Sequence, residues 1–84
     1  MDNKILVEIS VPAADKTFDV YIPLDSKLAE VSRLTAIALS DLSGEKFKAD
    51  AGTILCDADT GDVFDRNKEI AELGIHTGSH LMLI

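Results

Sequence analysis

The sequence predicts a small α+β domain in which one main helix packs on one face of a mixed sheet. Residues 4–11 and 17–22 alternate apolar and polar side chains, which is typical of half-buried strands. Residues 26–42 change to apolar spacings of three and four, which is typical of a helix. Because each kind of element leaves one apolar side uncovered, the two are expected to bury each other.

The first two strands are expected to form a β-hairpin with one wet face. Ile5, Val7, Ile9 and Val11 share one side of the first strand. Phe18, Val20 and Ile22 share one side of the second. Pro12 ends the first strand, and residues 13–16 make a tight connection.

The helix is expected to begin after Asp25 or Ser26, either of which can cap its first amides, and to end at Gly44. Phe47 is expected to pack against the helix end. The predicted buried stripe consists of Leu28, Val31, Leu34, Thr35, Ala38, Leu39 and Leu42.

The second half of the chain predicts three shorter pieces of structure. Residues 53–56 and 63–64 are expected to form a short strand and a brief return strand around a turn at 57–62. Ile70 and Leu73 indicate a short helical turn, which Gly74 stops. Residues 81–84 are apolar throughout, so they predict a last strand in the middle of the sheet, paired on both sides.

Composition and charge exclude several classes of function. The 84 residues predict a single domain, residues 1–84, with a net charge of −7 from 15 acidic and 8 basic residues. So few cations disfavour nucleic acid and anionic membranes as direct partners. The acidity serves either solubility or a basic patch on a partner. With no signal peptide, no apolar run near the roughly 20 residues of a membrane span, and a lone Cys56, we expect a cytoplasmic protein.

No catalytic, cofactor or metal site is predicted. Counted from Asp57, a calcium loop would need other residues at its fifth, sixth and twelfth positions, where Gly61, Asp62 and Lys68 stand. His76 and His80 have a zinc-like spacing, but Gly78 places a turn between them. Cys56 is interpreted as a buried, inert thiol on the strand face that it shares with Ile54.

A surface patch is the predicted functional site. One side of the three central strands is expected to face the helix, and its apolar residues are Ile5, Val7, Ile54, Cys56, Leu81 and Leu83. The alternate residues of the same strands then face the other way, where no element remains to cover them. Such a patch marks a protein interface, a homodimer contact or incidental exposure. The predicted patch consists of Leu6, Leu55, Met82 and Ile84, extended by Tyr21.

The closing segment, residues 70–83, resembles that of ubiquitin-like domains, with an apolar short turn and a Gly-containing tight turn before a last strand of alternating leucines. Over the whole chain the order of elements matches the β-grasp order. In length the chain is most similar to the small bacterial YukD/EsaB proteins of type VII (WXG100, ESX-like) secretion systems. It departs from them at Gly78-Ser79, where that family usually has Gly-Asp.

The resemblance implies a β-grasp fold with a four- to five-stranded mixed sheet, one main helix and a short helical turn. It also implies a non-catalytic accessory or regulatory component that binds other secretion components and is recruited to a membrane complex. The sequence ends at Leu83-Ile84 without the Gly-Gly tail of conjugated relatives. Two alternatives stay open: a protein modifier or sulfur carrier, and a stand-alone homologue of a transporter's regulatory ubiquitin-like domain.

Overall fold

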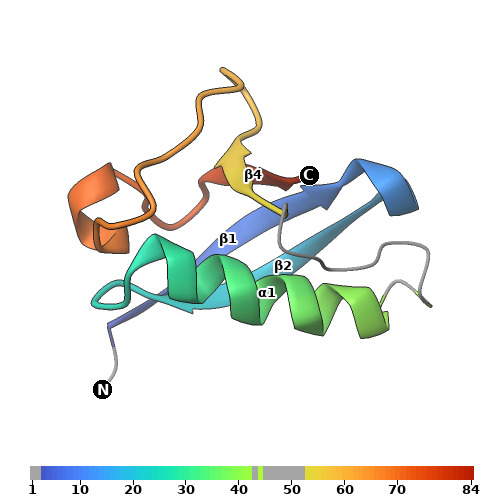
Figure 1. Cartoon of the computed structure of the whole chain (residues 1–84), viewed down its shortest axis with the longest axis horizontal. Coiled ribbons are helices and arrows are strands. Elements are labelled where there is room, and N and C mark those ends of the chain that lie inside the picture. The colour runs from blue at the N-terminus through green and yellow to red at the C-terminus, as the bar shows by residue number, and fades with distance from the viewer. Residues whose placement is uncertain (1–2, 43, 45–52) are drawn as a thin grey trace.

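Four strands and one main helix form two layers in a computed structural model that describes residues 3–42, 44 and 53–84 (Figure 1). The sheet has the strand order β2-β1-β4-β3, as the β-grasp prediction requires. In chain order, the elements are β1 (Lys4–Val11), η1 (Pro12–Ala14), β2 (Lys16–Pro23), α1 (Leu28–Leu42), β3 (Leu55–Asp57), η2 (Ile70–Leu73) and β4 (His80–Leu83).

The predicted hairpin is confirmed along its whole length. β1 and β2 pair antiparallel from Lys4 opposite Pro23 to Val11 opposite Lys16. The connection is the 3-10 turn η1, which Asp15 closes in a left-handed conformation with φ 53°. The Asp15 amide donates to the Pro12 carbonyl at 3.0 Å. The short polar side chain of aspartate tolerates this conformation better than most residues do.

The last strand is central, as its apolar composition predicts. β4 runs parallel to β1 on one side and antiparallel to β3 on the other. The predicted return strand at residues 63–64 is only an isolated bridge between Val63 and Cys56. The described part of the sheet therefore has four strands, the lower of the two numbers predicted.

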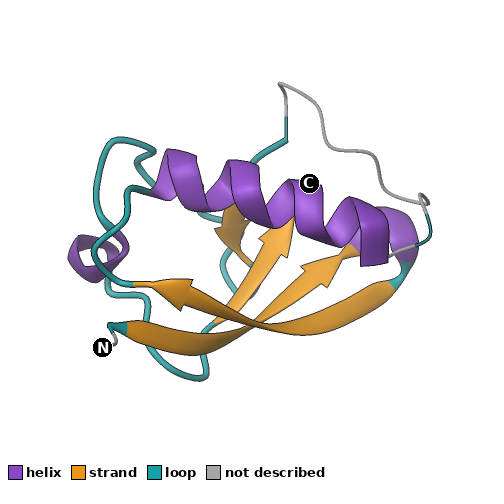
Figure 2. Cartoon of the chain, turned by 90° about the horizontal axis from the view of Figure 1, so that it is seen from below, coloured by secondary structure: helices purple, strands orange, loops and turns teal. Residues whose placement is uncertain are grey.

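Helix α1 covers one face of the sheet and leaves the other without a covering element in the described chain (Figure 2). Val7, Ile9 and Val11 of β1 and Leu81 and Leu83 of β4 alternate into the core beneath it. The predicted helical stripe is partly wrong, because Leu34, Ala38 and Leu42 are exposed. The buried residues of α1 are Leu28, Val31, Ser32, Thr35, Ala36 and Leu39.

Two features explain where α1 sits. Ser32 and Ala36 are small, so they let the helix approach the sheet more closely than Leu34 and Leu42 would. The first amides of α1 do not use Asp25 or Ser26 as caps: the Leu28 amide donates to the Lys68 carbonyl at 2.9 Å, and the Ala29 amide donates to the Arg66 carbonyl at 3.1 Å. A distant backbone segment thus supplies the acceptors that a side-chain cap would otherwise provide.

The predicted helical turn near residue 70 is confirmed as η2, which inserts the fully buried Ile70 into the core. Glu69 and Glu72 form a reciprocal capping box at its start. Gly74 ends it with φ 76°, a conformation that glycine adopts without steric cost. The expected packing of Phe47 lies outside the described residues.

Candidate functional site

The sheet face turned away from α1, here called the outer face, carries most of the predicted patch. Leu6 pairs with Tyr21 across β1 and β2, and both belong to the set of alternate positions that point away from the core. Met82 holds the same position on β4, between the core residues Leu81 and Leu83. Ile84 follows β4 and exchanges two hydrogen bonds with Ile54. Four of the five predicted residues therefore belong to the outer face.

Leu55 is the exception, and its predicted orientation is wrong. It is 1% exposed and lies opposite Leu83 in the core. Ile54 and Cys56 therefore point to the outer face instead of toward the helix. Three consecutive apolar residues carry no alternation, so the sequence could not decide which of them faces inward.

Cys56 is buried on the outer face. The Sγ atom donates to the Met82 carbonyl oxygen at 3.6 Å, and Val63 pairs with Cys56 from the other side. Burial raises the pKa of the Cys56 thiol, and the neighbouring Asp57 carboxylate raises it further. A thiol that resists deprotonation is a poor nucleophile and a poor metal ligand at neutral pH.

The outer face is not one continuous apolar patch. Glu8 lies between Leu6 and Ser10 on β1 and pairs with Asp19 on one side and His80 on the other. This polar row separates two apolar groups. Leu6 and Tyr21 form the first, and Met82, Ile84, Ile54 and Val63 form the second. Met82 pairs with Ser10, so it lies about 13 Å beyond Leu6 along the strands, the length of four residues.

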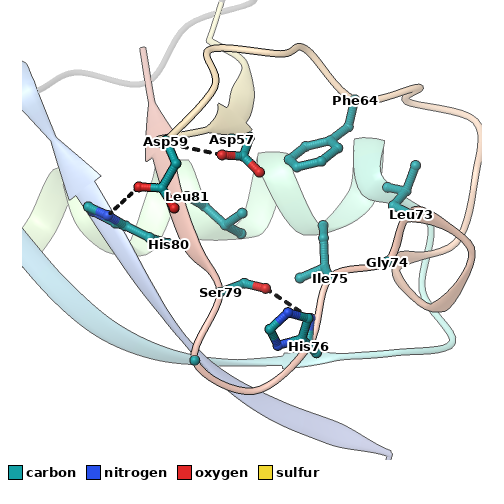
Figure 3. Close-up of a pocket in the computed structure, with 11 residues that line it drawn as sticks. Asp57, Asp59, Phe64, Leu73, Gly74, Ile75, His76, Ser79, His80 and Leu81 are labelled. Carbon is teal, nitrogen blue, oxygen red and sulfur yellow. Dashed lines mark hydrogen bonds and ion pairs between the residues drawn. The ribbon is translucent and has the colours of Figure 1, made fainter.

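A hydrogen-bonded chain of polar side chains crosses the middle of the face. The Ser10 hydroxyl lies 2.7 Å from Nε2 of His80 and 3.2 Å from the Thr17 hydroxyl. Nδ1 of His80 lies 3.7 Å from a carboxylate oxygen of Asp59, too far for a hydrogen bond (Figure 3). The order Asp59, His80, Ser10 resembles a catalytic triad, but there the aspartate is buried and bonded to the imidazole. Here the Asp59 side chain is 78% exposed.

A pocket of about 220 Å³ opens beside this chain, at the edge where the turn after β3 meets the segment before β4 (Figure 3). Asp57, Asp59, Ser79 and His80 form its polar side, and Phe64 contributes an aromatic wall. One Asp57 carboxylate oxygen already accepts the amides of Asp59 and Thr60, at 2.8 and 3.1 Å. This is the local turn function expected for these aspartates.

The two histidines occupy different surroundings. His76 is exposed, and its Nδ1 contacts the Thr77 carbonyl oxygen at 2.9 Å. Gly78 turns the chain between the histidines with φ 92°. Among the described residues, no three histidine, cysteine or acidic side chains form a group that could hold a metal ion.

Sequence reasoning missed three kinds of surface residue. Ile54 and Val63 join the patch because of the register of β3, which its short apolar segment does not encode. The row of Glu8, Asp19 and His80 depends on strand pairing over long separations. Leu34, Ile37 and Leu42 of α1 are also exposed, on the opposite side of the molecule. No described helix is long and apolar enough to cross a membrane.

Comparisons with known proteins agree with this architecture. The ubiquitin-like domain of EccD1, a type VII secretion system protein of Mycobacterium tuberculosis, superposes with a TM-score of 0.78 at 16% identity, covering 96% of this chain and 97% of that one. The EccD5 ubiquitin-like domain from Mycobacterium xenopi gives 0.79 at 20% identity, with coverages of 96% and 92%. A chain of the MycP5-free ESX-5 inner membrane complex gives 0.82 at 14% identity over 98% of this chain and 21% of that one.

At these identities the structural matches show the ubiquitin-like fold alone. No curated protein matches the sequence. The family model for the WXG100 protein secretion system (Wss) protein YukD, however, matches residues 6–83, almost the whole chain. With this match and the β-grasp architecture together, the chain belongs to the YukD family of WXG100 secretion proteins.

Proposed function

We propose that this chain is a non-catalytic docking module of a WXG100 secretion system and that it binds a protein partner through its outer face. The observation that carries the proposal is the pair of apolar groups that no described element covers. Tyr21 and Ile84 are 67% and 51% exposed, one in each group. Exposed apolar side chains gathered on one sheet face mark an interface on a small protein.

A binding role accounts for the polar chain better than catalysis does. The Asp59 carboxylate is exposed and too far from His80 to orient it, so Ser10 lacks the support that an activated nucleophile needs. Reactive sites sequester their substrates from water, whereas Glu8, Thr17 and Asp19 around Ser10 are exposed. We place the protein in the cytoplasm, recruited to a membrane secretion complex, in keeping with its family.

We further propose that the protein acts without being conjugated. The amide and the carbonyl oxygen of Ile84 are hydrogen-bonded to Ile54 at 2.9 and 2.8 Å, so Leu83 and Ile84 are held in the sheet. Conjugation through this segment would require both hydrogen bonds to break. A covalent adduct at Ile84, found by mass spectrometry of the protein from its own cells, would support the modifier or sulfur-carrier alternative instead.

A matched pair of variants tests the docking face. Ile84 and Ile37 are 51% and 52% exposed, but Ile84 belongs to the outer face and Ile37 lies on the solvent side of α1. Ile84→Asp is expected to abolish binding to the purified components of a WXG100 secretion system from the same cell, measured by biolayer interferometry. Ile37→Asp is expected to bind as the wild type does.

Circular dichroism must show that both variants are folded before their binding is compared. The proposal is wrong if no component binds the wild-type chain. It is also wrong if Ile84→Asp and Ile37→Asp bind equally well.

A further inference from the structure

We infer that the partner of the outer face is a protein segment that places lysine or arginine between two apolar side chains, and not a second copy of this chain. The inference rests on the proposed docking function and assigns the chemistry of the partner. It starts from the polar row that divides the two apolar groups.

The polar row carries two carboxylates that no described residue neutralises. Glu8 and Asp19 lie directly opposite each other on β1 and β2, and both are exposed. Neither side chain makes an ion pair or hydrogen bond within the described part of the chain. Like charges in such a cross-strand pair repel each other. A cation seated between them would relieve this repulsion at the moment of binding.

The surroundings strengthen the negative potential at the row. Asp59 lies beside His80 at the end of the row, and Asp57 lines the neighbouring pocket. The positive group on the outer face among the described strand residues is Lys4, which lies beyond Leu6 at the far end of β1. A segment whose cation sits over Glu8 and Asp19 can place one apolar side chain on Leu6 and Tyr21. A second apolar side chain, about 13 Å further along, reaches Met82.

The same charges argue against a homodimer through this face. A symmetric contact brings the same patch of both copies together, so Glu8 and Asp19 of one copy would approach Glu8 and Asp19 of the other. Each copy carries a net charge of −7, which adds long-range repulsion. Apolar contact alone would leave these carboxylates desolvated and unpaired, whereas a basic segment pairs them.

Two peptides serve as probes of this chemistry, independently of any secretion component. The first is acetyl-LSKSL-amide, whose lysine lies on the same side of an extended chain as its two leucines, and the second is acetyl-LSESL-amide, which keeps the apolar positions and reverses the charge. In ¹⁵N NMR titrations at low salt, the basic peptide is expected to shift the amides of Glu8, Asp19, His80 and Met82. The acidic peptide is expected to leave them unchanged. The double variant Glu8→Gln/Asp19→Asn is expected to bind the basic peptide roughly tenfold more weakly and with less dependence on salt.

The outcomes separate this inference from the proposed function. Shifts spread equally over acidic residues such as Asp25 and Asp41 would overturn the inference, and so would equal binding of both peptides. If Ile84→Asp abolishes binding to a secretion component while Glu8→Gln/Asp19→Asn binds it as the wild type does, the docking function stands and the basic partner is wrong. Sedimentation equilibrium that reveals a dimer lost in Met82→Asp would show that the occupant is a second copy.

Discussion

Leu55 on β3 lies opposite Leu83 on β4, and both side chains are buried in the core beneath α1. This pairing fixes the orientation of the whole third strand. Because side chains alternate along a strand, it sends Ile54 and Cys56 to the outer face. The composition of the candidate docking surface therefore depends on one register.

Replacing Leu55 with alanine tests this register. Leu55→Ala leaves a cavity in the core and is expected to lower the free energy of unfolding by about 2–5 kcal/mol. Leu34→Ala makes the same change at an exposed position of α1 and is expected to cost less than about 0.5 kcal/mol. Urea unfolding followed by circular dichroism measures both. Equal, small effects would mean that Leu55 lies on the surface.

The opposed carboxylates of Glu8 and Asp19 predict a stabilising substitution. Asp19→Asn removes one of the two like charges and is expected to raise the free energy of unfolding by about 0.2–1 kcal/mol at low salt. Added salt should shrink the gain, because exposed charges are screened. Asp25→Asn removes an exposed carboxylate outside the sheet and is expected to bring no gain. A gain at Asp25 as large as that at Asp19 would assign the effect to net charge alone.

Much of the fold could be predicted from the sequence because its longest segments carry a clear period. The alternation in residues 4–11 identifies β1 with its observed bounds, and the apolar end of the chain identifies β4 as a central strand. Ile70, Leu73 and Gly74 identify η2 because a spacing of three residues and a glycine stop are local signals. In each case the signal that identifies the element lies within a few residues of sequence.

The errors arise where tertiary contacts decide between equivalent local patterns. On α1, Leu34 fits the apolar spacing, but the smaller residues Ser32 and Ala36 are the ones buried against the sheet. On β3, three apolar residues in succession allow either face inward. The sequence does not predict the polar row, because Glu8, Asp19 and His80 meet only through strand pairing, across up to 72 residues of sequence.

The contact between Ser10 and His80 predicts a spectroscopic change. The Ser10 hydroxyl lies 2.7 Å from Nε2 of His80, so Ser10→Ala is expected to cost about 0.5–1.5 kcal/mol and to change the ¹⁵N shifts of the imidazole. Thr17→Val removes the hydroxyl that lies 3.2 Å from Ser10 but leaves the contact with His80 in place. It is expected to leave the imidazole shifts unchanged. Identical spectra for Ser10→Ala and the wild type would mean that the contact does not form in solution.

Cys56 predicts how stability changes in alkaline solution. Burial, and then the Asp57 carboxylate, raise the pKa of the thiol in the folded chain, so the unfolded chain loses the thiol proton first as the pH rises. The buried thiol therefore stabilises the fold fully below the ordinary thiol pKa of about 8.5. This stabilisation is lost as the pH rises toward the higher pKa of the thiol in the folded chain. The free energy of unfolding, measured in urea between neutral and alkaline pH, should fall more steeply for the wild type than for Cys56→Ala. Parallel curves would mean that the thiol titrates alike in the folded and unfolded chains.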